Sequence, residues 1–348
     1  MTRRAREEAK ALDRAALTRL ARALRGKAIA VIGDLVLDEY WVGRSSRISR
    51  EAPVLILEHE DERRVPGGAA NAAMNVRALG GSPLLVGRVG GDPAGVALSA
   101  ALRSSGLPTR WFYRDRRGGT VVKTRILAGS SHAARQQIVR LDRGHTERLT
   151  AEAERSLARA AREAIRRADA VLLSDYGYGV LGPPLRREAI AEARKRRIPI
   201  VVDSRYDLRS YRGATLLTPN EHEVLDAMRL PSLRTSVLKR AGEELVQNGA
   251  RAAWITRGSD GMLVLERGSR PIELSIVGSS DVADVTGAGD AVSAAAALAL
   301  AAGASQLTAA ILATYAAAVV VMKRGTATVS RDELLESIRA HPLPRVRA

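Results

Sequence analysis

The sequence predicts an α/β protein with three layers, α/β/α, in which helices cover both faces of a mostly parallel central sheet. Short runs of Val, Ile and Leu recur along the chain, and helical stretches separate them. These runs are apolar at successive positions, which is typical of strands with two buried faces. Their alternation with helices predicts parallel crossover connections in one large domain.

Six apolar segments are expected to form strands of the central sheet. They span residues 28–38, 82–90, 168–177, 198–204, 214–220 and 252–258. Seven segments are expected to form the covering helices. They span residues 69–79, 93–104, 151–167, 183–196, 236–248, 288–302 and 306–323.

Two segments depart from this rhythm. Residues 40–65 and 107–140 alternate polar and apolar residues in short runs such as APVLILEHEDERR and RQQIVRLD. Because this alternation is typical of antiparallel strands with one exposed face, we expect a small discontinuous β-sheet that protrudes from a main domain at residues 28–340. Residues 1–27 carry charges throughout an Ala/Leu background, which predicts an exposed N-terminal helical extension.

Composition excludes several classes of protein. None of the 348 residues is a cysteine, so disulfides and thiolate metal sites are excluded. We find neither a signal peptide nor a membrane-spanning segment, and therefore expect a cytoplasmic protein without membrane contact. The net charge of +17 comes from arginines in nearly every segment, while only 1 Phe, 3 Trp and 7 Tyr could stack on bases. We therefore expect anionic small molecules rather than nucleic acid as ligands.

Common nucleotide-binding and hydrolase motifs are also missing. The only Gly-Lys pair, Gly26-Lys27, precedes Ala28, so there is no P-loop. After the first strand the chain reads GDLVLDEYWVG, which lacks a dinucleotide-binding fingerprint. The five histidines show no metal-ligand spacing, and no G-x-S-x-G elbow is present.

The segment DVTGAGDA joins a glycine-rich turn to the start of an apolar helix. From these residues alone two interpretations are open. Asp290 could be a plain helix N-cap in an ordinary loop. Alternatively, glycines that admit a close ligand and the unpaired amides of the first helical turn could form an anion site.

Four stretches in a fixed order help to decide between these interpretations: VIGDLVLDEYW, VPGGAANAAMNVRALGG, LLTPNEHEV and DVTGAGDA. Together they resemble the ribokinase-like (PfkB) family of sugar kinases, over residues 28–333. The Gly-Gly-x-x-Asn motif at residues 67–71 and the D-x-T-G-A-G-D motif at residues 284–290 are signatures of that family. The resemblance implies a ribokinase-like fold with a β-sheet lid, ATP as co-substrate, Mg²⁺, and a homodimer formed through the lid.

Within this family, further stretches are similar to the kinases that phosphorylate the anomeric hydroxyl of D-glycero-D-manno-heptose 7-phosphate, a step of ADP-heptose synthesis for the lipopolysaccharide core. They are GRSSRISREAPV, QQIVRLDRG, VLLSDYGYGVL and KRGTATVSRDEL. Many of those kinases continue into a nucleotidyltransferase. Because this chain ends at Ala348, soon after the last expected helix, we expect a kinase domain alone.

The chain departs from the subfamily pattern at three places. Tyr178 stands where Lys is usual, Arg50 replaces Pro, and Thr314-Tyr315 replaces Asn-Ala near the expected adenine site. Two alternatives therefore stay open. One is another sugar kinase of the family, such as a ribokinase, fructokinase or phosphofructokinase, and the other is a sugar-binding or nucleotide-binding regulator without catalysis.

The resemblance assigns the chemistry of phosphoryl transfer to the DVTGAGDA segment. Asp290 would be the base that accepts the hydroxyl proton, and we expect the helix dipole to keep it ionised. The amides of Gly287, Ala288 and Gly289 would form the anion hole for the developing charge. Thr286 would contact ATP.

The same resemblance places the acceptor sugar on the first half of the chain. Asp34 would bind two sugar hydroxyls, and Gly67, Gly68 and Asn71 would approach the sugar closely. An aspartate in a turn and a helix start after glycines are the alternatives. Arg47 and Arg140 on the lid are candidate partners of a sugar phosphate, although arginines are frequent throughout the chain.

The ATP and metal site is expected on the second half of the chain. Asn220 and Glu223 match the family's N-x-x-E motif, which helps to hold Mg²⁺, with Glu223 acting through water. From the residues alone, Asn220 after Pro219 is an ordinary helix cap. The remaining candidates are expected along the ATP phosphates and are Thr256, Arg257, Gly258 and Gly261.

Overall fold

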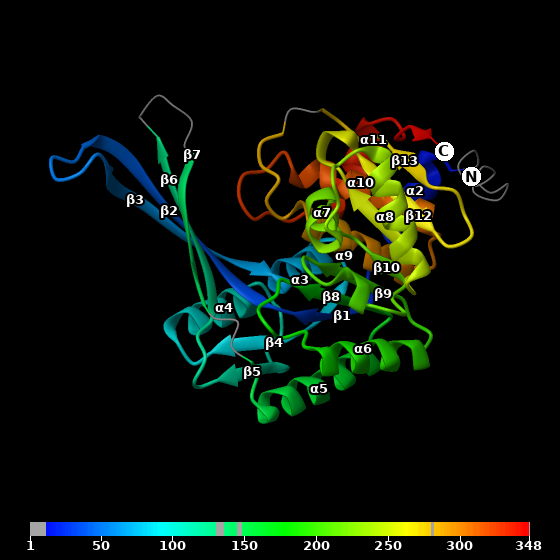
Figure 1. Cartoon of the computed structure of the whole chain (residues 1–348), viewed down its shortest axis with the longest axis horizontal. Coiled ribbons are helices and arrows are strands. Elements are labelled where there is room, and N and C mark those ends of the chain that lie inside the picture. Colours follow the sequence, from blue (N-terminus) through cyan, green and yellow to red (C-terminus); the bar gives the residue numbers. More distant parts are fainter. Residues whose placement is uncertain (1–11, 130–135, 145–147, 280–281, 348) are drawn as a thin grey trace.

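The computed structural model describes residues 12–129, 136–144, 148–279 and 282–347, which form a helix-covered main sheet and a second sheet that projects from it (Figure 1). The main sheet has the strand order β14-β13-β12-β11-β10-β9-β8-β1-β4-β5. Its strands are β1 Ala28–Gly33, β4 Ser82–Gly90, β5 Phe112–Asp115, β8 Ala170–Asp175, β9 Ile200–Ser204, β10 Leu216–Leu217, β11 Ala252–Thr256, β12 Met262–Glu266, β13 Ile272–Leu274 and β14 Val346–Arg347.

The strands from β11 to β5 in this order run parallel, whereas β12, β13 and β14 form an antiparallel edge. Neighbouring residues of β1 point into different cores: Ile29 and Val31 join one cluster, and Ala30 and Ile32 join the other. The central strands are therefore buried on both faces, as the continuous apolar runs predicted.

Helices cover the two faces as two separate layers. One layer contains α2 Arg14–Ala23, α3 Ala69–Ala78, α4 Pro93–Ser104, α9 Ala288–Ala301, α10 Gln306–Val320 and α11 Arg331–Ala340. The other contains α5 Ala151–Arg166, α6 Pro183–Lys195, α7 Glu221–Met228 and α8 Thr235–Gln247. The predicted three-layer α/β/α class is confirmed. None of the described helices has the length and apolar character that a bilayer crossing requires.

The second sheet is called the lid here and has the strand order β3-β2-β6-β7. Its strands are β2 Leu35–Ile48, β3 Leu55–Gly68, β6 Val121–Gly129 and β7 Gln136–Arg143. The pairs β2–β3 and β6–β7 are antiparallel, and the central pair β2–β6 is parallel. The lid extends away from the helical body as a long twisted ribbon (Figure 1).

Three expectations about the elements are wrong in detail. The apolar run 28–38 is two strands rather than one, because the chain leaves the main sheet at Asp34 and enters the lid. The lid segment expected at 107–140 starts later, because β5 pairs with β4 in the main sheet. The N-terminal helix is not simply exposed, since Leu17, Ala21 and Leu24 are fully buried. Their helical spacing gives α2 an apolar stripe that packs on the core; residues 1–11 lie outside the described residues.

Candidate active site

A cavity of about 760 Å³ lies at the carboxyl ends of the parallel strands. Residues at the ends of four neighbouring strands line it: Asp175, Asp203, Thr218 and Thr256. The N-terminal turn of α9 forms another wall. Ligands of open α/β sheets bind at this edge because the side chains and helix N-termini that follow the strands converge there.

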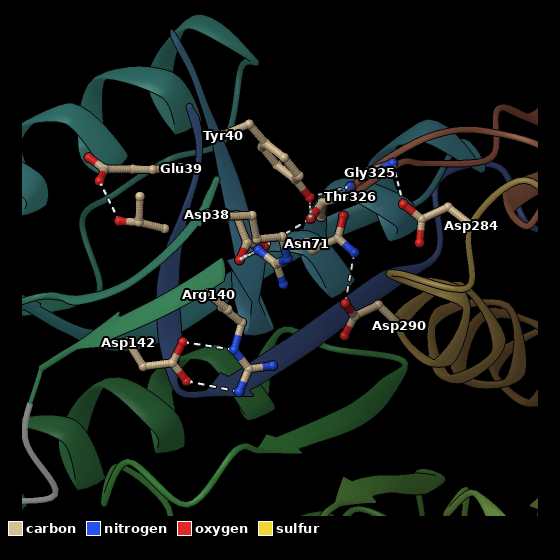
Figure 2. Close-up of polar contacts among 12 residues, drawn as sticks. Asp38, Glu39, Tyr40, Asn71, Arg140, Asp142, Asp284, Asp290, Gly325 and Thr326 are labelled. Atoms are coloured by element: carbon tan, nitrogen blue, oxygen red, sulfur yellow. Dashed lines mark hydrogen bonds and ion pairs between the residues drawn. The ribbon is translucent and has the colours of Figure 1, made fainter. Parts of the chain in front are cut away.

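Asp290 is the acidic residue of the first turn of α9 and is only 4% exposed. The N-cap position is taken by Gly287 in a left-handed conformation (φ 84°), and no side chain caps the helix. The carboxylate of Asp290 instead accepts a hydrogen bond from Nδ2 of Asn71 at 2.7 Å (Figure 2). It accepts a second one from Oη of Tyr176 at 2.8 Å. The N-cap interpretation of Asp290 is therefore wrong.

Burial raises the pKa of Asp290 to about 6, although the hydrogen bonds from Asn71 and Tyr176 and the charge of Arg205 oppose this rise. Desolvation therefore outweighs the helix terminus and the hydrogen bonds in setting this pKa, yet the carboxyl stays mostly ionised at neutral pH, as expected. A carboxyl with this pKa is largely ionised at neutral pH and can also hold a proton, which suits a general base.

The turn before α9 presents backbone amides beside Asp290. The amides of Gly287 and Gly289 have no hydrogen-bond partner among the described residues, and both residues line the cavity. Ala288 also lines the cavity, but its amide donates to the carbonyl of Val285 at 3.2 Å. Two of the three expected anion-hole amides are therefore available to a ligand, and the third is engaged within the turn.

Asp34 does not face the cavity. It is 1% exposed, and its carboxylate accepts hydrogen bonds from the backbone amides of Tyr176 at 2.9 Å, Tyr178 at 3.1 Å and Val180 at 3.0 Å. Burial and the neighbouring carboxylate of Asp175 raise the pKa of Asp34 to about 6. The predicted contact of Asp34 with sugar hydroxyls is therefore wrong, because this side chain anchors the loop after β8.

The two motif glycines make room within the protein itself. A Cβ atom on Gly67 would lie 2.3 Å from Oδ2 of Asp38, and one on Gly68 would lie 2.6 Å from the carbonyl oxygen of Asp34. Gly68 also has φ 59°, which a side chain would disfavour. Neither glycine lines the cavity, nor does Asn71, whose amide holds Asp290.

The lid turns a charged face toward the body, which we call the inner lid face. It carries Asp38 and Tyr40 of β2, Lys123 and Arg125 of β6, and Arg140 and Asp142 of β7. Arg125 and Arg140 line the cavity. Arg125 pairs with Asp38 at 2.6 Å, and Arg140 pairs with Asp142 at 2.9 Å; Figure 2 shows the second pair with its two dashed contacts.

Arg47, the other expected phosphate partner on the lid, lies elsewhere. It is exposed and is the penultimate residue of β2, opposite Ile56 near the distal end of the lid. At about 3.3 Å per residue it is about 40 Å along the strand from Leu35. The expected role of Arg47 in the cavity of its own chain is therefore wrong.

Asn220 and Glu223 form a capping box at the start of α7. The side chain of Asn220 accepts from the amide of Glu223 at 2.9 Å, and Oε2 of Glu223 accepts from the amide of Asn220 at 2.8 Å. Both residues also line the cavity. The capping bond uses only Oε2 of Glu223. The other oxygen, Oε1, lies 3.9 Å from Nε of Arg205, which also lines the cavity.

The other expected ATP residues divide into two groups. Thr256, Gly258, Gly261 and Thr286 line the cavity. Arg257 does not, because its guanidinium donates to Thr235 at 3.0 Å and to Asp260 at 3.2 Å. The expectation that Arg257 lies along the ATP phosphates is therefore wrong for its side chain, which instead joins α8 to the turn after β11.

The cavity floor carries an acidic group that could hold a hydrated cation. Asp203 is half-buried beside Glu223, and desolvation and the charges of Glu223 and Asp290 raise its pKa well above its usual range. The described residues contain no ready cluster of three direct metal ligands. Oε1 of Glu223, which Arg205 approaches only to 3.9 Å, and the neighbouring Asp203 nevertheless fit Mg²⁺ that keeps its waters and is held jointly with phosphate oxygens.

The structure also locates the three departures from the subfamily pattern. Thr314 lines the cavity, whereas Tyr315 is fully buried in the core, and its hydroxyl donates to the carbonyl of Pro342 at 2.9 Å. Arg50 is exposed in the turn between β2 and β3, away from the cavity. Tyr178 lies at the junction of lid and body, with its ring 5.4 Å from Nζ of Lys123.

Several residues at the cavity have no counterpart in the sequence-based site. Tyr176 binds Asp290, and the guanidinium of Arg205 stacks on the ring of Tyr176 at 4.4 Å. Arg205 directly follows the predicted strand 198–204, and Tyr176 stands near the end of the predicted strand 168–177, so their place at the carboxyl ends of β8 and β9 was a usable signal. Asp38 could be placed near the site only by knowing that one strand ends at Asp34 and another begins, and the continuous apolar pattern of residues 28–38 does not show this break.

Comparisons with known proteins agree with this geometry. The model of the pfkB family of carbohydrate kinases matches residues 27–333. The chain belongs to this family. Among solved structures, Arabidopsis thaliana ribokinase complexed with ribose and ATP superposes with a TM-score of 0.70 at 20% identity, covering 90% of this chain and 99% of that one. Escherichia coli phosphofructokinase-2 in complex with potassium gives 0.71 at 19% identity, covering 90% and 98%. The ribokinase-like fold is confirmed.

Curated relatives give higher identity. Bifunctional protein HldE of Azorhizobium caulinodans is 42% identical over 308 residues, which cover 88% of this chain and 63% of the relative. The protein of the same name from a Caulobacter species is 41% identical over 322 residues, covering 92% and 64%. This pfkB-family chain therefore spans somewhat less than two thirds of the length of these relatives.

Proposed function

We propose that this protein uses ATP to phosphorylate D-glycero-D-manno-heptose 7-phosphate at its anomeric hydroxyl, giving the 1,7-bisphosphate for ADP-heptose synthesis. The observation that carries the kinase part is the position of Asp290. Its buried carboxylate stands beside the free amides of Gly287 and Gly289 at the edge of the cavity. A non-catalytic binding protein would need neither a base at this place nor an anion hole next to it.

In the proposed reaction, Asp290 accepts the proton of the acceptor hydroxyl as the hydroxyl oxygen bonds to the γ-phosphorus of ATP. The bond from that phosphorus to the bridging oxygen breaks, and ADP leaves with its electron pair. The amides of Gly287 and Gly289 and the guanidinium of Arg205 stabilise the charge on the moving phosphoryl group. Asn71 and Tyr176 hold the carboxylate of Asp290 in place for the proton transfer.

Mg²⁺ would neutralise the phosphate oxygens of ATP when bound, and Glu223 and Asn220 would hold its water shell. We expect activity to vanish with EDTA and to return with Mg²⁺. Glu223→Gln keeps a side-chain acceptor for the amide of Asn220 but removes a charge, so the Mg²⁺ concentration for half-maximal activity should rise about tenfold. A titration of activity against Mg²⁺ measures this shift. Equal Mg²⁺ dependence in both proteins would remove Glu223 from the metal site.

The heptose phosphate is proposed because the lid sequences GRSSRISREAPV and QQIVRLDRG resemble those of heptose 7-phosphate kinases. The cationic inner lid face and the similarity to the HldE proteins support this choice of acceptor. The test is a panel of acceptors with ATP: heptose 7-phosphate, ribose, fructose and fructose 6-phosphate. We expect the first to give the highest kcat/KM by at least about 100-fold, since charge-assisted contacts are stronger than those to neutral hydroxyls. A comparable kcat/KM for ribose or fructose would contradict the proposed heptose acceptor but not the proposed kinase activity.

We also propose a homodimer formed through the lid, in an enzyme that works in the cytoplasm where ATP is supplied. Trp41 of β2 and Val139 and Leu141 of β7 are exposed by 38%, 51% and 50%. The strand register puts them on the lid face opposite to the inner one. A second lid would cover these apolar side chains. Sedimentation tests this: wild type should be a dimer and Val139→Asp a monomer. The same oligomeric state for both proteins would contradict the proposed interface.

A further inference from the structure

Lys123 on the inner lid face is a buried cation without a counter-ion. It is 5% exposed, and no hydrogen bond or ion pair involves its ammonium group within the part of the chain that the structure describes. Its contacts are the rings of Tyr176 at 5.1 Å and Tyr178 at 5.4 Å. Buried lysines are nearly always paired, so an ammonium group in this position is costly for the free protein.

The neighbouring carboxylates are already engaged. Lys123 stands opposite Asp38 in β2 and opposite Asp142 in β7. Asp38 binds Arg125 through Oδ1 and the hydroxyl of Thr326 through Oδ2, at 2.6 and 2.9 Å. Asp142 binds the guanidinium of Arg140 through both oxygens, at 2.9 and 3.1 Å. The inner lid face therefore carries three cations against two carboxylates, and Lys123 holds the excess charge.

The groups that face Lys123 come from three parts of the fold. They are Asp38 of β2, Arg140 and Asp142 of β7, and Tyr176, Tyr178 and Arg205 of the body. Burial and the positive charge of Arg205 lower the pKa of Lys123 to about 8, against the opposing effect of the two carboxylates. An anion placed between lid and body would relieve both of these effects.

We infer that Lys123, together with Arg140 and the ring of Tyr178, forms the subsite for the acceptor's own phosphate, the one that is not transferred. The phosphate monoester would sit under the inner lid face, where Arg140 lines the cavity and Lys123 supplies the unpaired charge. This inference rests on the proposed function for the identity of the acceptor. It replaces the clamp of Arg47 and Arg140 expected from the sequence, since Arg47 lies at the distal end of the lid.

The first experiment measures the binding of inorganic phosphate by calorimetry, with the nucleotide site filled by a non-hydrolysable ATP analogue and Mg²⁺. We expect Lys123→Met to weaken phosphate binding about 100-fold, because a desolvated charge pair is lost. The matched control is Lys239→Met on α8, whose ammonium pairs with Glu273 at 2.7 Å outside the cavity, and it should bind phosphate as wild type does. Unchanged phosphate affinity in Lys123→Met would overturn the subsite.

The pH dependence separates a charge contact from a structural role. Phosphate affinity of wild type should fall as the pH rises through about 8, because the free Lys123 loses its proton there. Lys123→Arg should keep its affinity to higher pH, since a guanidinium stays charged. Lys123→Met should unfold at pH 7 no more easily than wild type, because it removes an unpaired buried charge. A Met variant that unfolds more easily, or equal pH profiles for wild type and the Arg variant, would contradict the inference.

Turnover separates the subsite from the acceptor assignment. If heptose 7-phosphate is a good substrate and Lys123→Met lowers kcat/KM equally for heptose and for its 7-phosphate, the subsite is wrong and the proposed function stands. If wild type ignores heptose 7-phosphate while Lys123→Met still loses phosphate affinity, the acceptor is wrong and the subsite stands. Gluconate that displaces phosphate more strongly than a sugar phosphate does would show a carboxylate site and overturn the inference.

Discussion

Asp34 and Asp290 both accept a hydrogen bond from Tyr176 in the loop after β8, and in both cases burial raises the pKa to about 6. Their hydrogen-bond donors differ. Asp34 is held by three backbone amides, which cannot turn away, and it does not line the cavity. Asp290 is held by two side chains, lines the cavity and stands beside unpaired amides. A raised pKa therefore marks burial in both, and only the donors and the access to the cavity separate the carboxylate of Asp34 from that of Asp290, the proposed base.

The largest effect should follow the replacement of Asp290. We expect Asp290→Asn to lower kcat by about 10²–10⁴-fold while ATP binding persists, because the acceptor hydroxyl loses its base. Single-turnover kinetics with the heptose phosphate, and calorimetry with an ATP analogue, measure the two effects. Turnover near that of wild type would contradict the role of Asp290 as base.

The same variant should be at least as stable as wild type at neutral pH. The folded state holds the proton of Asp290 more tightly than the unfolded state does, so its stability falls as the pH rises from 3.8 through about 6. At pH 7 this costs the folded protein about 3 kcal/mol at most. In urea unfolding, the free energy of unfolding of Asp290→Asn should exceed that of wild type above pH 6 and differ little from it near pH 4.

The next largest effect is expected for Asp34, and it is an effect on folding. Asp34→Ala leaves the amide of Val180 buried and those of Tyr176 and Tyr178 partly buried without their acceptor, so we expect the free energy of unfolding to fall by about 3 kcal/mol. Urea unfolding at pH 7 measures this loss. Asp169→Ala is a useful comparison, because its carboxylate accepts a single exposed amide, that of Ala28, at 2.8 Å. Equal losses in the two variants would mean that Asp34 is no special anchor.

The sequence predicted Asp290 and its turn because all the parts of that site lie within seven successive residues. It also predicted the layers and the main helices, since continuous apolar runs and helical spacing are local properties. The pair Asp34 and Asp38 shows where such prediction fails. Both stand in GDLVLD, and only the departure of the chain from the main sheet at Asp34 decides which carboxylate turns to the lid.

Lys123 illustrates a second kind of failure. Nothing in VVKTRILAG indicates a functional lysine. The proposed role of Lys123 depends on its strand register with Asp38 and Asp142 and on its contact with the aromatic rings of the loop after β8. Arg47 is the converse, because it stands in a recognisable motif whose place on a long strand takes it away from the cavity. Pairing between distant strands carries this information, and periodicity within one segment does not contain it.

The smallest and most specific effect concerns Tyr176, which donates to Oδ1 of Asp290 and thereby lowers the pKa of that carboxyl. Tyr176→Phe keeps the ring under Arg205 and removes only the hydroxyl, so the pKa of Asp290 should rise above its value of about 6. Because the base must be ionised, the acid limb of the kcat/KM profile should move to higher pH. The loss of activity should be about tenfold at pH 6 and only about two- to threefold at pH 8. Tyr113→Phe on β5, outside the cavity lining, should leave the acid limb in place. If Tyr176→Phe lowers kcat/KM by the same factor at every pH, the hydroxyl of Tyr176 does not set the pKa of Asp290. The side-chain donors of Asp290 would then only hold its carboxylate in place, as the backbone amides do for Asp34.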